Sequence, residues 1–448
     1  MLPIYFEMNP GETFTDDFGT DRLHTICLRA VKPCVEPLYQ NGIWFDVFRD
    51  AQVDLLVDGQ ALTIWCAPYQ LPVTFCGLTI EADLVPAAAG GIQAIPIQKA
   101  VRLAALSADR PWMAEAFSFP MPDGRWHASN YTHTWNGFVH VVEYRQPASV
   151  YYHRGEDFGA YPDRHPFVAG IDGVLTVCPP AGGDGDSNVL MVENREMGVC
   201  CYHANAHTVD AKLRAGDAVE RDRPLALTGN TWAGHSVSDP HLHVGFYQAG
   251  ADEVESAMNT YACMVRAYRE RFPDELLPVA GGYRFVRAGE SIELTARRSI
   301  ACDDSGDVRY RWLFTDGTAS EGEAVQKRYA AAGVYTEILE MTDDAGRTAF
   351  DTVMVYVSDG VCSMLPFATI NIWPVRGIRA GQTAELLVYP SRMTQAEIDF
   401  GDGSRQALAC GDRNDIRHAW EKPGHYAVTV RGRGEGCQGV FSIVVAVD

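Results

Sequence analysis

The sequence has little of three features that would each point to a particular class of protein. It carries 37 Lys and Arg residues against 58 Asp and Glu residues, a formal net charge of −21, whereas proteins that bind nucleic acid present a basic face to the phosphates. No segment approaches the roughly 18–20 consecutive apolar residues of a membrane-spanning helix. The twelve cysteines include no CxxC pair, which argues against a cysteine metal cluster. We therefore expect neither a nucleic-acid partner nor a membrane-spanning helix.

The N-terminus and the cysteines leave the cellular compartment open. The first seven residues contain neither the basic segment nor the long apolar segment of an export signal. An even number of cysteines permits disulfides without requiring them. Cys410 and Cys437 could pair within the last domain, or both could be buried free thiols.

The residues that are present indicate a protein made mainly of β-strands. A length of 448 residues suggests three or four folding units. Short runs of alternating apolar residues, such as Gln52–Asp58 and Leu62–Cys66, are bounded by turn residues and predict antiparallel sheet. One helix is expected from about Asp252 to Phe272, where apolar residues recur at helical spacing and Pro273 ends the pattern.

The last third of the chain contains an internal repeat. Each copy has an aromatic strand, an Asp-Gly turn at Asp316 or Asp402, and a later Gly-x-Tyr strand at Gly333 or Gly424. This pattern resembles the polycystic kidney disease (PKD) type of immunoglobulin-like domain, although Thr315 stands where the first glycine of the turn is expected. The resemblance implies two β-sandwiches and says little about function.

Three segments in the middle of the chain place His and Asp where they could converge on a metal ion. The first is an HxxxD motif, His153 to Asp157, and the second is a strand that ends at His203. The third is an HxH motif, His241 and His243, on an apolar run. Residues i and i+2 of a strand project from one face, so both histidines of the HxH motif would enter the same cavity. In an extended segment, His153 and Asp157 also share a face.

Two imidazoles and one carboxylate form a common catalytic zinc set, because three protein ligands leave one tetrahedral position open. Zinc lowers the pKa of water and polarises a carbonyl oxygen, as hydrolysis of an amide requires. The same ligand types also describe non-haem iron sites, so the residues alone leave both metals open.

The order of these motifs resembles the lysostaphin and LytM type of zinc metallopeptidase, which cleaves peptide cross-links of bacterial peptidoglycan. The matching pieces lie between Tyr151 and Tyr247 and include the turns at Gly216 and at Gly229. The resemblance implies Zn²⁺ as the cofactor, with His153, Asp157 and His243 as its ligands. It implies a peptide or peptidoglycan substrate and an extracellular or cell-envelope location, and it leaves the oligomeric state open.

The same resemblance implies a catalytic pair, His241 and the histidine that closes the middle strand. We expect the latter to be His203, because it directly follows the strand and has Tyr202 beside it. His207 is the alternative, since its distance to the turn at Gly216 also fits the family. The loop from Gly229 to His241 carries Trp232 and His235 and is expected to border the substrate groove.

Other histidines are expected to be surface or core residues, although His133 and His140 could lie near the rim of the groove. Glu156 should point away from Asp157 and is a poor candidate base.

The sequence thus predicts a zinc-dependent endopeptidase with accessory β domains. The alternative is a non-catalytic cell-surface protein that binds glycan or peptide and retains the peptidase fold. The predicted units are an N-terminal β-rich domain, the metallopeptidase domain, a linking helix and two PKD-like sandwiches, at residues 1–120, 121–250, 251–277, 278–358 and 359–448, respectively.

Overall fold

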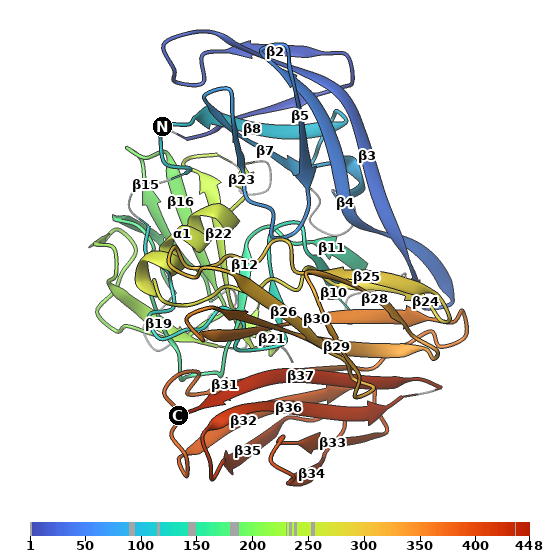
Figure 1. Cartoon of the computed structure of the whole chain (residues 1–448). Helices are drawn as coiled ribbons and strands as arrows, with labels where there is room; N and C mark the ends of the chain where they lie inside the picture. The colour runs from blue at the N-terminus through green and yellow to red at the C-terminus, as the bar shows by residue number, and fades with distance from the viewer. Residues whose placement is uncertain are drawn as a thin grey trace.

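The computed structural model describes residues 2–88, 95–113, 117–141, 149–179, 188–229, 231–232, 235–236, 240–251, 256–434 and 436–448. The side chains of residues 140–141, 149–150, 231–232 and 235–236 are not part of this description. Over these ranges the chain forms mainly antiparallel sheets with a single α-helix (Figure 1). The prediction of a mainly β protein is confirmed. No helix in the described ranges has the length and apolar character needed to cross a membrane.

The N-terminal region consists of two four-stranded sheets that enclose one core. The first sheet has the order β1 (Ile4–Met8), β8 (Val101–Ser107), β7 (Leu78–Leu84), β6 (Val73–Phe75). The second has the order β2 (Thr13–Asp16), β3 (His24–Gln40), β4 (Ile43–Val57), β5 (Gln60–Cys66). A short 3-10 helix, η1, spans Pro86–Ala88. Alternate residues of β4 and β5, such as Val53, Leu55 and Ile64, are buried in the core, because one face of each sheet packs on the other.

The hairpin of β3 and β4 extends beyond this core to the first C-terminal sandwich (Figure 1). There Glu36 accepts hydrogen bonds from the Arg284 guanidinium and from the Phe285 backbone N–H. The Tyr39 N–H donates to Ser358 Oγ at 3.0 Å. The long hairpin therefore ties the N-terminal region to the C-terminal part of the chain.

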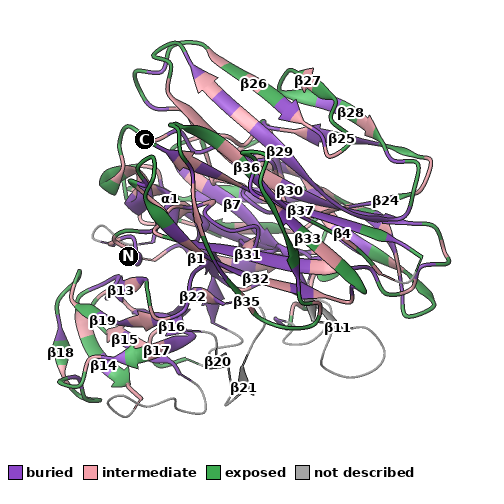
Figure 2. Ribbon diagram, turned by 90° about the horizontal axis from the view of Figure 1, so that it is seen from below, coloured by how far each residue is buried: buried purple, intermediate pink, exposed green. Residues whose placement is uncertain are grey.

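The central region, residues 121–250, is dominated by one sheet. Its strands, in spatial order, are β18 (Ala218–Val219), β14 (Gly173–Val177), β15 (Leu190–Asn194), β16 (Val199–Ala204), β22 (His241–Gln248), β12 (Glu156–Gly159) and β9 (Thr132–His133). β23 (Ala257–Met258) also pairs with β22. Figure 2 shows that β14 and β18, at one end of this sheet, are largely exposed, whereas β16 and β22 are mostly buried.

Three smaller sheets complete the central region. Their strands are β13 (Pro166–Val168), β19 (Pro224–Thr228) and β17 (Ala206–Val209); β10 (Phe138–Val141) and β11 (Ser149–Tyr152); and β20 (Thr231–Trp232) and β21 (His235–Ser236).

The helix α1 is shorter than the sequence predicts. It spans Tyr261–Arg271 and ends before Pro273, as expected. Residues 252–255 of the predicted helix lie outside the described residues, and Ala257 and Met258 form β23 instead. Its buried residues, among them Met264, Val265 and Tyr268, pack into the core of the central region.

The C-terminal part contains two sandwiches whose sheets are joined. One nine-stranded sheet comprises β24 (Arg284–Arg287), β30 (Thr348–Ser358), β29 (Gly333–Asp343), β37 (Gln438–Val447), β36 (Gly424–Arg433), β33 (Gln395–Asp399), β34 (Arg405–Leu408), β26 (Val308–Leu313) and β27 (Ala319–Glu321). The opposing sheets are β25 (Ser291–Thr295) with β28 (Ala324–Arg328), and β31 (Phe367–Trp373), β32 (Thr383–Ser391) with β35 (Asn414–Ala419). A parallel pairing of β29 with β37 connects the two sandwiches.

Neither of the two alternatives for Cys410 and Cys437 is what the structure shows. Cys437 forms a disulfide with Cys362, and Cys410 is a free thiol. Cys362 lies in the segment that enters the second sandwich, and Cys437 immediately precedes β37. The disulfide therefore closes the start of this sandwich onto its last strand.

Candidate metal centre

Three neighbouring strands place the predicted metal ligands in one row. In the register between β12 and β22, Asp157 lies opposite His243. In the register between β12 and β9, the same Asp157 lies opposite His133. Directly opposed residues of antiparallel strands project to the same face of a sheet. His133, Asp157 and His243 therefore project side by side from one face.

Three of the predicted residues bring their donor atoms together. His243 Nδ1 lies 2.8 Å from Asp157 Oδ1 and 2.8 Å from His153 Nε2. His153 Nε2 lies 3.1 Å from Asp157 Oδ1. Donor atoms at 2.0–2.1 Å from a tetrahedral zinc ion would be about 3.3 Å apart. His153, Asp157 and His243, called the ligand group below, thus have the chemistry and spacing of a three-ligand zinc set.

The surroundings of His153 and Asp157 favour the protonation states that a metal requires. Burial lowers the pKa of His153 to about 4, so the ring is neutral at pH 7. Burial alone would raise the pKa of Asp157, but His153, His241 and the other surrounding histidines hold it well below its usual range. Neutral imidazole and ionised carboxylate are the forms that bind metal ions.

A glycine makes room for this arrangement. Gly155 has φ +148°, and a Cβ atom there would lie 2.5 Å from the Val244 carbonyl oxygen and 2.9 Å from His243 Cε1. Any side chain at this position would displace either a backbone strand or a ligand ring. The sequence between His153 and Asp157 therefore requires glycine at its centre.

His241, the first histidine of the HxH motif, lies beside the ligand group. Its Nε2 is 3.5 Å from Asp157 Oδ1, and its side chain is 12% exposed. The side-chain amide of Asn205 lies 2.8 Å from the same nitrogen. The Tyr131 ring packs on His241 with a centroid distance of 5.0 Å. His241 and His243 are more exposed than His153 and Asp157, so the group opens toward solvent on the side of β22.

The position of His203 differs from the expectation that it faces the metal. His203 is opposite Val244, and Ala204 is opposite His243. Because successive residues of a strand alternate between faces, His203 projects away from His243. Its fully buried ring stacks on Phe167, and its Nε2 lies 3.6 Å from Cys201 Sγ. This expectation is therefore corrected, and His203 is a residue of the hydrophobic core.

The alternative, His207, lies on β17 just beyond a bend in the chain. Asn205 adopts a positive φ of +62° between β16 and β17, which interrupts the alternation of the preceding strand. The His207 side chain is 35% exposed and contacts Asp163 and Thr208. A residue that transfers protons during hydrolysis needs access to solvent. His207 has this access, and His203 does not.

The sequence does not predict three residues of the site: His133, Tyr131 and Asn205. His133 enters the site through the register of β9, and a two-residue strand leaves no periodic signal. Tyr131 reaches it by packing on both His133 and His241. The Asn at the bend before β17 is a residue type that tolerates positive φ, and this signal could have marked the turn.

Glu156 occupies the opposite face, as expected. It accepts hydrogen bonds from Thr134 Oγ1, the Trp135 N–H and Thr260 Oγ1. Burial raises the pKa of its carboxyl well above the usual value. It therefore connects β12 to the start of α1 and has no contact with the solvent side of the ligand group.

Parts of the predicted motifs lie outside the described residues. These are Asn230 of the turn at Gly229, Asp239, and the side chains of His140, Trp232 and His235.

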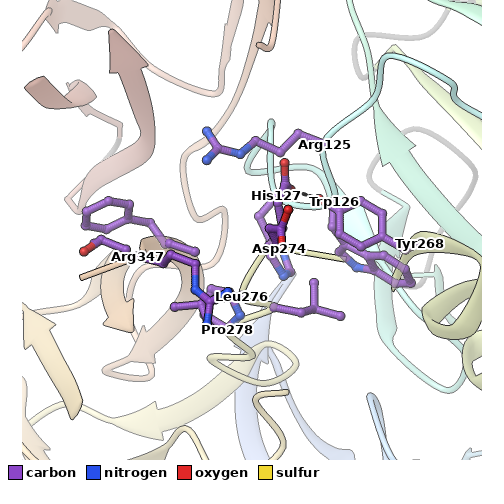
Figure 3. A pocket seen from close by; sticks show the side chains of 13 residues that line it. Arg125, Trp126, His127, Tyr268, Asp274, Leu276, Pro278 and Arg347 are labelled. Atoms are coloured by element: carbon purple, nitrogen blue, oxygen red, sulfur yellow. Dashed lines mark hydrogen bonds between the residues drawn. The ribbon is translucent and has the colours of Figure 1, made fainter. Parts of the chain in front are cut away.

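Three cavities lie at the junctions between domains. One, of about 250 Å³, lies between the central region, α1 and the first sandwich, and is lined by Arg125, His127 and Arg347 among others (Figure 3). None of the predicted site residues lines it. Another, of about 400 Å³, separates the N-terminal region from the first sandwich and includes Tyr69 and Tyr283. A narrow cavity of about 20 Å³ shares these two tyrosines and reaches His133.

Comparison with known proteins identifies one accessory module. Residues 277–357 match a family model described as PKD domain, which confirms the PKD-like prediction at that position. Among solved structures, the catalytic domain of the antimicrobial peptidase lysostaphin from Staphylococcus simulans is similar at 15% identity and a TM-score of 0.24. That match covers 31% of this chain and 92% of the other. LytU is similar at 18% identity and a TM-score of 0.25, over 32% of this chain and 91% of the other.

Proposed function

We propose that this protein is a zinc-dependent endopeptidase that hydrolyses peptide bonds, with peptidoglycan cross-links or stem peptides as its substrates. The observation that supports the proposal is the convergence of the His153, Asp157 and His243 donor atoms, with His241 beside them. A bound zinc ion would supply Lewis-acid polarisation of a carbonyl group and a lowered pKa of water.

In this proposal the ligand group holds the ion and the more exposed histidines handle protons. His241 lies on the solvent side of the ligand group, where its ring can exchange a proton with the attacking water or stabilise a developing oxyanion. Asn205 and Tyr131 fix the orientation of this ring from two sides. For the second catalytic histidine, partial exposure favours His207 over the core residue His203.

Metal analysis combined with a cleavage assay tests the proposal. The purified protein should contain about one zinc per chain and should release new amino termini from purified peptidoglycan or glycine-containing peptides, as detected by mass spectrometry. His243→Ala and Asp157→Ala should lose both zinc and activity. The matched control is His425→Ala, an exposed histidine of the second sandwich, which should retain both.

Three results would contradict the proposal. Zinc without hydrolysis of any substrate would support a non-catalytic binding protein. Iron with oxygen-dependent chemistry would indicate an oxygenase. Full zinc retention in His243→Ala would refute the ligand assignment itself.

A second comparison separates the two candidate histidines. His207→Ala should retain zinc while activity falls by about 10²–10⁴-fold, as expected for loss of a general acid or base. His203→Leu should retain measurable turnover at neutral pH, since the ring it replaces faces the core. The opposite result would restore the assignment of His203.

We also propose that the protein acts outside the cell or in the cell envelope. The PKD domain match and the Cys362–Cys437 disulfide support this location, because disulfides persist mainly in oxidising compartments. Fractionation of the source cells, with differential alkylation of thiols, tests it. Recovery in the cytosolic fraction with both cysteines reduced would contradict it.

A further inference from the structure

His133 is a buried histidine that lies next to the ligand group but is not one of its three members. It occupies the last position of the row that runs from His243 through Asp157 to β9. Its side chain is only 4% exposed. A buried polar ring normally has a hydrogen-bonding partner. The groups that face the His133 ring therefore indicate its role.

The two oxygens of Asp157 have different neighbours. Oδ1 lies 2.8 Å from His243 Nδ1 and 3.1 Å from His153 Nε2. Oδ2 lies 3.4 Å from His133 Nδ1. His133 Nδ1 is buried and makes no hydrogen bond within the described part of the chain, so Asp157 Oδ2 is the acceptor that it faces. One oxygen is thus directed at the ligand group, and the other is directed at His133.

Two aromatic rings from different parts of the chain hold the His133 ring in place. The Tyr131 ring contacts it edge-on at a centroid distance of 4.4 Å, and the Tyr283 ring at 5.2 Å. Tyr283 belongs to the segment that leads into the first C-terminal sandwich. The ring therefore cannot turn away from Asp157 without displacing one of these neighbours.

We propose that His133 is a positioning residue for the metal ligand Asp157. Its Nδ1, 3.4 Å from Asp157 Oδ2, is placed to donate a hydrogen bond to that oxygen, which would restrain rotation of the carboxylate and direct Oδ1 toward the other two donor atoms. Hydrogen bonds of this kind orient metal ligands and raise metal affinity. The inference rests on the proposed function, because it requires that the ligand group binds zinc.

Zinc affinity of a set of His133 variants tests the inference without relying on enzymatic activity. His133→Phe keeps a ring between Tyr131 and Tyr283 but removes the donor, and should weaken zinc binding by about 10–100-fold in a chelator competition assay. His133→Asn places an amide N–H near the position of Nδ1 and should retain affinity close to the wild type. His133→Gln places its amide near the position of Nε2 and should lose affinity as His133→Phe does.

The matched control is His127→Phe. His127 is another buried histidine whose Nδ1 faces a carboxylate, Asp351 Oδ1, at 2.9 Å, but it lines the cavity of Figure 3, to which no residue of the ligand group contributes. This variant should leave zinc affinity unchanged. The melting temperature of each metal-free variant shows whether a loss of affinity reflects general destabilisation.

The outcomes separate this inference from the proposed function. Equal zinc affinity in the wild type, His133→Phe and His133→Gln would overturn the role of His133 while leaving the metal site intact. Failure of the wild type to bind zinc would overturn both. If His133→Phe does not fold, the zinc affinities of His133→Asn and His133→Gln test the inference. Affinity retained only in His133→Asn supports it. Equal affinity in both variants refutes it.

Discussion

The buried imidazole of His203 contributes to the dependence of the protein's stability on pH, and replacing it should weaken that dependence. Burial lowers the pKa of His203 to about 4, an effect that His243 increases and a backbone hydrogen bond at Leu190 opposes. An unfolded chain binds a proton on this ring below pH 6.5, whereas the folded chain does not until about pH 4. The contribution of the neutral His203 ring to the free energy of unfolding is therefore fully present above pH 6.5 and is lost as the pH is lowered toward 4. The difference between the two pKa values corresponds to roughly 3 kcal/mol.

The variant His203→Leu tests this reasoning, because leucine has nearly the volume of histidine and no proton to bind. Urea unfolding of the metal-free protein, followed by tryptophan fluorescence between pH 4 and pH 7, measures the effect. The variant should lose less stability than the wild type across this range, by up to roughly 3 kcal/mol. The variant His207→Leu, which removes a partly exposed histidine outside the core, serves as the control. Parallel loss of stability in the wild type and His203→Leu would refute the assignment of His203 to the core.

Three further predictions concern the ligand group and its support. Gly155→Ala should destabilise the protein by about 1–3 kcal/mol and weaken zinc binding, as measured by thermal unfolding and zinc titration. Gly216→Ala shares the positive φ but has open space around it and should leave zinc binding unchanged. Asn130→Ala leaves the Ala368 carbonyl and the Ile370 N–H without their hydrogen bonds at 2.7 and 2.8 Å, and should cost about 1–3 kcal/mol in urea unfolding. Removing metal with EDTA should lower the melting temperature, and zinc at a thousand times its Kd should restore about 4 kcal/mol.

The ligand group could be predicted from sequence because its motifs are local. The HxH and HxxxD spacings fix which side chains share a face within one strand or turn, and this geometry does not depend on the rest of the fold. The structure brings His241 and His243 to the side of Asp157 that these spacings predict.

The face of His203 could not be predicted because its strand gives no alternating signal. Every residue of β16, from Val199 to Ala204, is buried, so polar and apolar positions do not reveal which side faces the core. The bend at Asn205 then changes the phase before His207. A preference for the histidine nearest the strand therefore selected the wrong face.

Pairings between distant segments were equally hidden from sequence. The partner of Cys437 depends on the packing of the second sandwich, where Cys362 lies 75 residues away. The start of α1 depends on the pairing of Ala257 with Tyr247, which places Ala257 and Met258 of the predicted helix in a strand. Both outcomes are set by tertiary contacts, which override local propensity.

The first sandwich does more than separate domains, because it helps to position the edge of the candidate metal centre. β9 is the last strand of its sheet and spans only Thr132 and His133, so two residues of pairing with β12 cannot fix it alone. Its position depends on neighbours: Asn130 binds β31 of the second sandwich, and Tyr283 from the first sandwich packs on His133. On the other side, a Cβ at Gly159 would lie 2.3 Å from Ser129 Cβ, which shows how closely this segment covers β12. The row that ends at His133 therefore depends on both C-terminal modules, and metal affinity should respond to changes at interfaces that no ligand residue touches.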